Sequence, residues 1–416
     1  MLEERLSLAP MMDVTDAHFR RLLRIMTKKT VLYSEMVVDD TINHSPNLEF
    51  CLGRHPDLYP SVIQLGGSNP ETLGQAAELC GRYDDGYAEI NLNAGCPSSR
   101  VSKRCFGAQL MLKPDLVREI VHNMSRRSTL PVSVKCRLGV SGQRDKYEEL
   151  VEFITAAHAG GAQKFIVHSR DCVLEGLSTK QNRSVPPLRY DVVHRLVQEF
   201  PDLTFVLNGG IHTLAAAHEH LVPWRVDIGS SAANGGLPPV PSSRTIVTDE
   251  STGAEERAAK DCRFEGPPLP GDPVVLPPVH GVMIGRAVAA EPVLFCTVDS
   301  DFYHVKDPCR SRRDLLEQYC DYCDWIQGES GPRRNTSDGK TQQVSTALLT
   351  NAMRNVMCGT PNNRRFLRSL NDVYVERINT AEYPQASDII REAIKCVADE
   401  HLDAPLEATG KGKAMV

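Results

Sequence analysis

The sequence lacks any long hydrophobic run. Its 416 residues contain no stretch of about 18 consecutive apolar residues, the length that a membrane-spanning helix needs. The first residues, MLEERLSLAPMMD, also lack the basic segment and apolar core of a secretory signal peptide. We therefore expect no membrane association and an intracellular protein, with the cytoplasm favoured and an organelle kept as the alternative.

Two nucleotide-binding patterns and a zinc pattern are missing as well. Neither G-x-G-x-x-G nor G-x4-G-K-[ST] occurs, which disfavours a Rossmann dinucleotide site and a P-loop. Cys320 and Cys323 form a lone C-x2-C without a second pair at zinc spacing, so we expect no metal site. The thirteen cysteines are an odd number in a chain without a secretory signal, which favours reduced thiols over disulfides.

The sequence has little excess charge overall, but its basic residues are unevenly placed. A formal net charge of -6 excludes a protein that is basic throughout. Residues 331–371 nevertheless contain seven basic residues and a single acid, Asp338. The basic residues are Arg333, Arg334, Lys340, Arg354, Arg364, Arg365 and Arg368. This asymmetry indicates a face that binds a polyanion.

Short apolar runs rich in Val, Ile and Leu recur eight times in the first 300 residues, and most are followed by an amphipathic stretch. The runs are residues 6–10, 31–36, 61–65, 88–92, 132–136, 165–168, 204–207 and 281–284. The helical stretches between them are residues 70–83, 114–127, 146–161 and 189–201. Eight strand-helix repeats predict an α/β fold, a closed (β/α)8 TIM barrel over residues 1–300.

Two further regions depart from this pattern. Residues 229–278 hold nine prolines and six glycines without apolar periodicity, which predicts a disordered insertion after the seventh barrel helix. Residues 301–404 contain only helical patterns and predict a small all-helical domain, and residues 405–416 a flexible tail. The predicted helices of this domain are residues 311–326, 345–357, 362–378 and 386–402.

Polar or glycine-rich residues close all eight apolar runs. In a parallel barrel the reactive groups lie at the C-terminal ends of the strands, so these residues are candidates for the site. They are Pro10, Met11, Met12, Glu35, Gln64, the segment 91–96, Lys135, Arg137, His168, Arg170, Asn208, Gly209, Gly210, Gly285 and Arg286. Taken singly, Lys135 is explained as a salt-bridged barrel lysine, His168 as a core histidine and Cys96 as a small buried hydrophobe. Their coincidence at one end of the barrel favours a functional site.

The last two endings, LNGGI and MIGRA, follow the seventh and eighth runs. Barrels commonly bind a phosphate there through glycine amides and a helix N-terminus. A phosphorylated cofactor is therefore expected. Because no dinucleotide-binding motif is present, we favour flavin mononucleotide (FMN), whose single phosphate needs only one such pocket.

These motifs also resemble a known family. LAPMMDVTDAHFR, VIQLGGSNPETL, EINLNAGCPSSRV, VKCRLG, HSRDCVLEGLSTKQNRSVPPLRYD, LNGGI and GVMIGRA are similar to tRNA-dihydrouridine synthases, most closely subfamily A, which acts around position 20 of the tRNA D-loop. The likeness runs in order from residue 6 to about residue 290 and continues more weakly to about residue 400. It implies a barrel that carries FMN, a helical domain that grips tRNA, and NADPH as reductant. We expect a monomer.

The resemblance also assigns the ring-binding residues. Pro10, Met11 and Met12 would line the isoalloxazine ring of FMN, with Gln64 bonding its edge and Lys135 facing the ring system. The residues that would hold the ribityl phosphate end are His168, Asn208, Gly209, Gly210, Gly285 and Arg286.

On the substrate side, the resemblance makes Cys96 the catalytic acid and brings Asn93 into contact with a flipped-out uridine. Lys180 and Arg183 match positions that orient tRNA. Reduction of the uracil 5,6 double bond needs a hydride on carbon 6 and a proton on carbon 5 from the opposite face. A thiol with the usual pKa of about 8.5 is mostly protonated near neutrality, so a cysteine suits that role.

The sequence departs from the family pattern at three places. Val14 replaces a tryptophan, Asp171 stands where a basic residue is common, and Asn351 replaces a histidine of the helical domain. Arg364 and Arg368 keep an arginine-aromatic-arginine pattern there and are the residues that we expect to contact tRNA. The exact uridine is left open.

Two other functions stay open at this point. An FMN-dependent TIM-barrel oxidoreductase acting on a small pyrimidine would show similar glycine and lysine placements, but would not need a basic helical domain. A non-enzymatic RNA-binding protein would need neither Cys96, Lys135 nor His168.

Overall fold

The computed structural model describes most of the chain. The described residues are 3–53, 56–82, 86–98, 105–140, 146–226, 274–329, 331, 334–335, 341–378 and 385–408. Of the basic segment 331–371, residues Arg333, Asp338 and Lys340 therefore lie outside the described residues.

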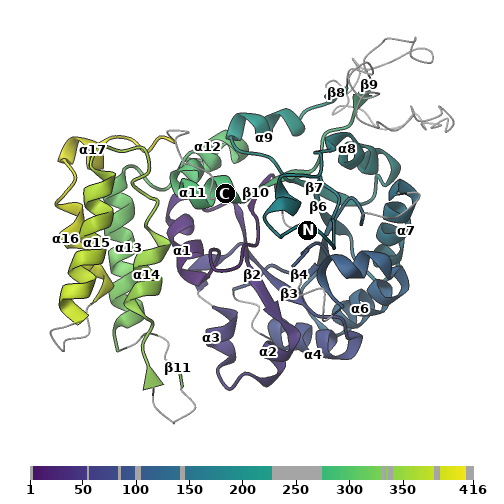
Figure 1. The fold of residues 1–416 in the computed structure, drawn as a ribbon, viewed down its shortest axis with the longest axis horizontal. Coiled ribbons are helices and arrows are strands. Elements are labelled where there is room, and N and C mark those ends of the chain that lie inside the picture. The colour runs from purple at the N-terminus through teal and green to yellow at the C-terminus, as the bar shows by residue number, and fades with distance from the viewer. Residues whose placement is uncertain are drawn as a thin grey trace.

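Eight parallel strands close into a barrel in the order β1, β10, β7, β6, β5, β4, β3, β2 (Figure 1). Their bounds are Leu6–Leu8, Gly281–Ile284, Thr204–Asn208, Lys164–His168, Val132–Arg137, Glu89–Asn93, Ser61–Gly66 and Val31–Val38 in the same order. The predicted TIM barrel and all eight predicted strands are confirmed, with ends that differ by at most two residues. Side chains that point into the barrel, such as Tyr33, Ile166 and Met283, form a dry core of their own.

The pairing register aligns polar residues of neighbouring strands in layers. Gln64 on β3 lies opposite Asn91 on β4, and Asn91 lies opposite Ser133 on β5. His168 on β6 lies opposite Asn208 on β7. Residues that are far apart in sequence thus meet inside the barrel near its C-terminal rim.

Helices cover the outside of the barrel, and they follow the sequence pattern closely. They are α1 Ala17–Met26, α2 Asp39–His44, α3 Leu48–Leu52, α4 Pro70–Gly81, α6 Pro114–Arg127, α7 Lys146–Ala159, α8 Tyr190–Glu199, α9 Leu214–His220 and α11 Arg286–Ala290. Helix α4, for example, begins where the sequence predicts because of its cap: the Asn69 side chain accepts from the backbone N–H groups of Glu71 and Thr72, and Pro70 occupies the first helical position. The four predicted barrel helices are confirmed.

The chain leaves the barrel after the seventh helix through an antiparallel pair of strands, β8 Trp224–Val226 and β9 Val274–Leu276, which projects past α8 (Figure 1). Most of the predicted insertion 229–278 lies outside the described residues. Its last residues do not fit the prediction of disorder, because Val274–Leu276 form a strand.

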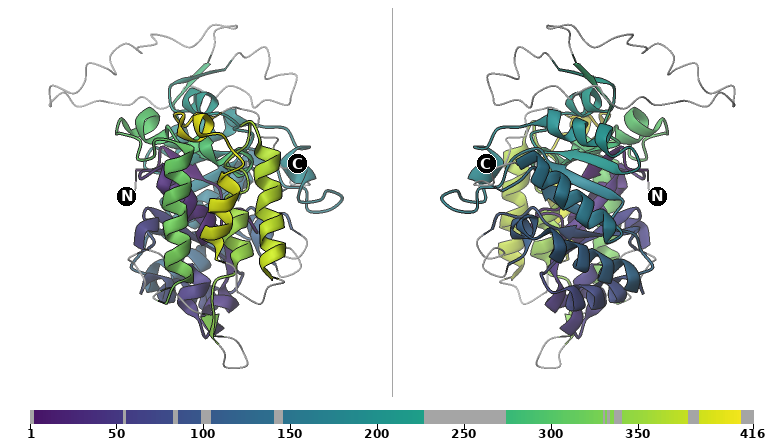
Figure 2. Two further views of the ribbon diagram at one scale, coloured as in Figure 1. Left: turned by 90° about the vertical axis from the view of Figure 1, so that its left-hand side faces the viewer. Right: turned by 90° about the vertical axis from the view of Figure 1, so that its right-hand side faces the viewer.

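A group of helices packs against one side of the barrel (Figures 1 and 2). They are α12 Val298–Tyr303, α13 Arg312–Gln327, α14 Thr346–Ala352, α15 Asn363–Ile378, α16 Ala386–Ile394 and α17 Asp399–Asp403, with a small hairpin of β11 Arg334–Asn335 and β12 Thr341–Gln342. Among the described residues, no helix combines the length and apolar composition that crossing a membrane requires.

The structure differs from the predicted helical region in four details. The helix predicted over residues 345–357 ends at Ala352, and the one predicted over residues 386–402 is divided into α16 and α17. The predicted boundary at residue 300 falls inside α12. Of the predicted tail, Leu406 is buried and its backbone N–H donates to the carbonyl of Arg310, while residues 409–416 lie outside the described part.

Helix α1 forms the contact between the barrel and the helical domain. His18 Nδ1 lies 2.8 Å from the hydroxyl of Tyr322 on α13, and the Arg21 guanidinium lies 5.7 Å from the centre of the same ring. Asn355 donates to the carbonyl of Ala289 at 2.7 Å. These contacts hold the helical domain, which carries the basic residues of segment 331–371, beside the barrel.

A buried ion cluster crosses the N-terminal part of the barrel. Lys164 is 3% exposed and pairs with Glu4 at 2.7 Å and with Glu89. Tyr33 donates to Glu4 at 3.1 Å. Burial alone would lower the pKa of Lys164, but the two carboxylates raise it above its usual value.

We expect Lys164→Met to lower the free energy of unfolding by about 3–5 kcal/mol, because it leaves buried carboxylates without their cation. The loss shrinks as pH falls, since Glu89, whose pKa burial already raises, can then take up a proton. Urea denaturation at several pH values measures this. Lys395→Met is the control, because its pair with Glu392 is exposed and such pairs contribute under about 1 kcal/mol. Equal effects of the two substitutions would contradict the role of the cluster.

Candidate functional site

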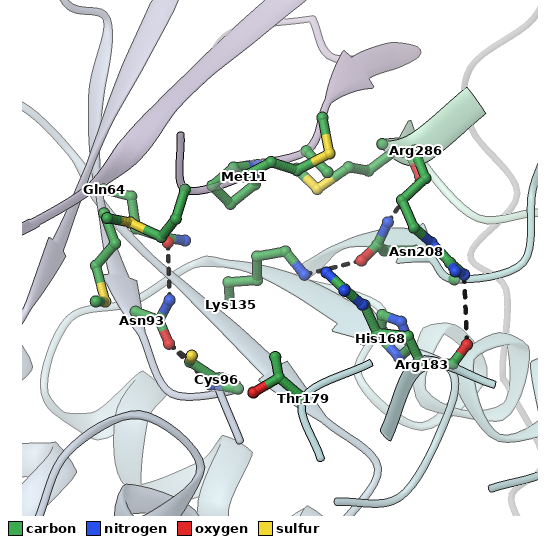
Figure 3. Close-up of a pocket in the computed structure, with 18 of the residues that line it drawn as sticks. Met11, Gln64, Asn93, Cys96, Lys135, His168, Thr179, Arg183, Asn208 and Arg286 are labelled. Atoms are coloured by element: carbon green, nitrogen blue, oxygen red, sulfur yellow. Dashed lines mark hydrogen bonds between the residues drawn. The ribbon is translucent and has the colours of Figure 1, made fainter. Parts of the chain in front are cut away.

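A cavity of about 1150 Å³ opens at the C-terminal ends of the barrel strands (Figure 3). It brings together fourteen of the residues that the sequence singled out. They are Pro10, Met11, Met12, Gln64, Asn93, Cys96, Lys135, His168, Arg183, Asn208, Gly209, Gly210, Gly285 and Arg286. Of the residues to which the sequence analysis gave a role, the other three, Lys180, Arg364 and Arg368, are exposed and do not line the cavity. Of the strand-end candidates without a role, Arg137 lines the cavity, whereas Glu35 and Arg170 do not.

Cys96 lies at a backbone corner directly after β4. The Oδ1 of Asn93 accepts from the backbone N–H of Gly95 at 3.2 Å and of Cys96 at 3.0 Å, which folds the chain back at this point. Arg137 Nε donates to the Gly95 carbonyl at 2.9 Å. A side chain at Gly95 would bring its Cβ within 3.3 Å of the Cys136 carbonyl carbon. The thiol is therefore half-buried and held at the cavity wall.

Lys135 lies at the centre of the cavity (Figure 3). Its ammonium donates to Asn208 Oδ1 at 2.8 Å, and Asn208 Nδ2 donates to the Met283 carbonyl at 2.8 Å, which fixes the asparagine. Burial, and then the charge of Arg137, lowers the pKa of Lys135 from 10.5 to about 7. An anion or an acceptor bound beside this nitrogen would favour its protonated form.

Two glycines shape the end of the cavity near β7. Gly209 and Gly210 have φ angles of +108° and +73°, which L-residues with side chains rarely adopt. A Cβ at Gly209 would lie 3.2 Å from the His168 ring, and one at Gly210 would lie 2.5 Å from Leu188 Cδ1. The Tyr190 hydroxyl donates to the Gly209 carbonyl at 2.9 Å. The backbone here is open to a ligand because no side chain can fill it.

Cations gather at this same end. Burial, followed by the charges of Arg183 and Arg170, lowers the pKa of Arg286. Burial and four surrounding cations hold the pKa of His168 well below 6.5. In the described part of the chain, no carboxylate forms an ion pair with Arg170, Arg183 or Arg286. The buried nitrogens His168 Nδ1, Arg170 Nε and Arg183 Nε have no hydrogen-bond partner there either. The arrangement fits an anion such as a phosphate.

Arg137 joins two loops of the site. Besides the Gly95 carbonyl, it donates through Nη1 to the carbonyls of Asp171 and Asn182, each at 3.0 Å. Asp171, where the family has a basic residue, pairs with Lys146 at 2.5 Å. The loop that carries Arg183 is therefore fixed to the backbone corner at Cys96 through Arg137 and to α7 through Lys146.

Sequence reasoning placed Arg137 and Arg170 at strand ends without giving either a role. It missed Thr179 and His212, which line the cavity from loops that carry no periodic signal. It also missed Ser133, which lies in the middle of an apolar run.

We expect Lys135 in the ligand-free protein to titrate with a midpoint near pH 7. Since its folded-state pKa is lowered from 10.5, the group adds to stability as pH rises from about 7 to 10.5. NMR of protein with ¹³C-methylated lysines measures the midpoint, and Lys135→Arg assigns the signal. Exposed lysines in the same sample serve as the control, with pKa values of about 10.4. A Lys135 midpoint equal to theirs would contradict the effect of burial.

Comparison with known proteins agrees with this geometry. A family model for dihydrouridine synthase (Dus) matches residues 7–227. A relative from Synechocystis sp., named tRNA-dihydrouridine(20/20a) synthase, is 37% identical over 317 residues, which cover 76% of this chain and 77% of the relative. A relative of the same name from Pseudomonas aeruginosa is 34% identical over 391 residues, which cover 94% of this chain and 96% of the relative.

A third relative of that name, from Pseudomonas syringae pv. tomato, is 47% identical over 221 residues, which cover 53% of this chain and 64% of the relative. The family model covers the strands that build most of the cavity, from β1 to β7. The chain belongs to the dihydrouridine synthase family.

Proposed function

We propose that the protein is an NADPH-dependent, FMN-carrying enzyme that reduces one uridine of the tRNA D-loop, at position 20 or 20a, to dihydrouridine. The observation that carries this proposal is the cavity itself. It has a thiol at one end and, at the other, a cradle: Arg170, Arg183 and Arg286, which form no ion pair with a described carboxylate, beside Gly209 and Gly210. The relatives' name, tRNA-dihydrouridine(20/20a) synthase, supports the substrate and the position.

The residues present fit FMN. His168 Nδ1 is a buried polar atom without a partner, and a Cβ at Gly209 or Gly210 would close the adjacent cradle. Gly209, Gly210, Gly285 and Arg286 would hold the phosphate through backbone N–H groups and the guanidinium. The residues proposed to line the ring are Pro10, Met11, Met12, Gln64 and Lys135.

FMN supplies the hydride for the uracil 5,6 double bond when it is bound. The chain's own residues perform the other tasks. Cys96 Sγ would give its proton to carbon 5 of the base, and the corner formed by Asn93 and Arg137 would aim the thiol. Lys135 would donate a hydrogen bond to an acceptor atom in the cavity, and the half-buried walls would limit the access of water.

The helical domain offers an exposed basic surface that would bind a macromolecular substrate. Arg364 and Arg368 lie one helical turn apart on α15 and are both exposed. The domain is fixed beside the barrel through α1 and α13 (Figure 1). A base has to leave its stack to enter the cavity, at a cost of a few kcal/mol that phosphate contacts would offset. Lys180, exposed on the loop beside Arg183, would add one such contact.

Cys96→Ala tests the reaction. We expect purified protein with FMN and NADPH to form dihydrouridine in unmodified tRNA, and the variant to lose about 10²–10⁴-fold in rate because its general acid is gone. Mass spectrometry of nuclease fragments measures the product and its position. Cys105→Ala, which removes an exposed thiol, is the matched control and should keep full activity.

Other outcomes of this experiment separate the alternatives. Bound FMN and NADPH oxidation without any dihydrouridine would reject the synthase and favour a flavoenzyme for small pyrimidines. A protein that stays colourless after addition of FMN would favour a non-enzymatic RNA-binding role.

The double variant Arg364→Ala with Arg368→Ala tests the grip. We expect it to weaken tRNA binding and to reduce the slope of log K against log salt by up to about 2, because two phosphate contacts are lost. Filter binding at several salt concentrations measures this. The control is Arg118→Ala with Arg126→Ala on α6, which lies on a different side of the barrel (Figure 1). An equal loss in both double variants would show that α15 has no special role.

A further inference from the structure

A row of polar side chains crosses three neighbouring strands behind the floor of the cavity. Asn93 Nδ2 donates to Gln64 Oε1, Gln64 Nε2 to Asn91 Oδ1, and Asn91 Nδ2 to Ser133 Oγ, each at 2.8 Å. Gln64 and Asn93 line the cavity, whereas Asn91 and Ser133 do not and are 0% and 1% exposed. The last two are therefore buried polar residues for which the mechanism has no use so far.

The direction of this row is fixed at its upper end by two backbone groups. The N–H groups of Gly95 and Cys96 can only donate, so the Asn93 atom that they contact has to be the oxygen. Asn93 Nδ2 then faces Gln64, which has to accept. Each amide in turn leaves the next one a single orientation.

The row ends at Ser133, because a hydroxyl can accept from Asn91 and still donate elsewhere. Beyond it lies Glu89 of the buried ion cluster: burial raises the pKa of this carboxyl, and the Lys164 and Ser133 side chains oppose that rise. All members of the row lie in a low-dielectric interior, where such chains polarise one another and a broken member is costly.

A count of hydrogen bonds shows what Asn93 can offer a ligand. Its oxygen accepts from two backbone groups, and one of its two N–H bonds goes to Gln64. The single unused group is an N–H donor, on a side chain that lines the cavity. A ligand atom that meets Asn93 therefore has to be an acceptor.

We propose that Asn91 and Ser133 are positioning residues: through Gln64 they support the orientation that the backbone N–H groups impose on Asn93, so that Asn93 presents an N–H donor to a carbonyl oxygen of the substrate base. This inference rests on the proposed function. Of the two RNA pyrimidines, uracil carries a carbonyl at positions 2 and 4, whereas cytosine carries an amino group at position 4. Both bases carry a carbonyl at position 2, so a donor at Asn93 distinguishes them at position 4, where it favours the uracil carbonyl and opposes the cytosine amino group.

Removal of the Ser133 hydroxyl, at the end of the row, would disturb the orientation of Asn93. Without the Ser133 hydroxyl, neither atom of the Asn91 amide has a partner at this end, so nothing there opposes the orientation that turns the Asn91 nitrogen toward Gln64. Gln64 would then turn its own nitrogen toward Asn93. The conflict arises there, since the backbone N–H groups of Gly95 and Cys96 cannot reverse.

Ser133→Ala tests the inference, with Ser7→Ala as its matched control. Ser7 is also a fully buried serine of a barrel strand, but its hydroxyl has no partner among the described residues. We expect Ser133→Ala to lower kcat for uridine reduction about tenfold at saturating FMN, with KM for tRNA and the rate of NADPH oxidation by the flavin unchanged. FMN binding, followed by flavin fluorescence, should weaken several-fold because Gln64 loses its fixed orientation. Ser7→Ala should leave all four quantities unchanged.

A second pair of variants keeps the test decisive if Ser133→Ala does not fold. Asn91→Asp retains an acceptor for Gln64, and Ser133 can turn to donate to it, so kcat should stay within about threefold of wild type. Asn91→Leu has no acceptor and should match Ser133→Ala. Thermal unfolding of every variant reports its stability.

Two results would overturn the inference: wild-type kcat and FMN affinity in Ser133→Ala, or equal kcat in Asn91→Asp and Asn91→Leu. Failure of the proposed function looks different, because wild-type protein itself would then form no dihydrouridine.

Discussion

The register between neighbouring parallel strands is the constraint on which the site depends. Once β3, β4 and β5 pair as they do, Gln64, Asn91 and Ser133 have to lie side by side. The same holds for His168 and Asn208 on β6 and β7. A slip of one residue in any pair would turn the polar side chains away from one another and leave them unpaired in the barrel interior. Strand pairing and site assembly are therefore selected together.

The two ends of the cavity obey different electrostatic rules. At the floor of the cavity the amides of Gln64, Asn91 and Asn93 are held by hydrogen bonds to one another and to Ser133, so their orientation is set without a ligand. At the other end the cations Arg170, Arg183 and Arg286 form no ion pair with a described carboxylate. Burial, and then the charges of Arg137, Lys135, Arg170 and Arg286, lower the pKa of His168. That end is strained until an anion neutralises it. In the proposed function, the cations at this end cost some stability and would bind the cofactor phosphate, while the hydrogen-bonded amides keep the Cys96 corner in place.

The sequence predicted the barrel well, because apolar runs of four to six residues and helix caps such as Asn69 act locally. The errors lie where a tertiary contact ends a helix. The apolar period continues past Ala352, yet the helix stops there, and Asn355 instead donates to the Ala289 carbonyl of the barrel. The candidate residues at strand ends were found because parallel strands share one rim. Ser133 was not, because a serine within VSVKC cannot be distinguished from a tolerated polar residue until its partner strand is known.

The barrel interior contains a series of polar side chains that extends from the buried ion cluster to the Cys96 corner. Lys164 and Glu89 lie at the N-terminal ends of their strands, Ser133 and Asn91 follow, and Asn93 holds the backbone of Cys96. Each of these buried polar side chains has at least one hydrogen bond or ion pair to a neighbour, which offsets the cost of its burial. Replacing one member of this row by an apolar residue would leave its neighbours without a hydrogen-bond partner. Single substitutions in the row are therefore destabilising even where they improve packing. The row can thus persist in an otherwise apolar barrel even where its lower members touch no ligand.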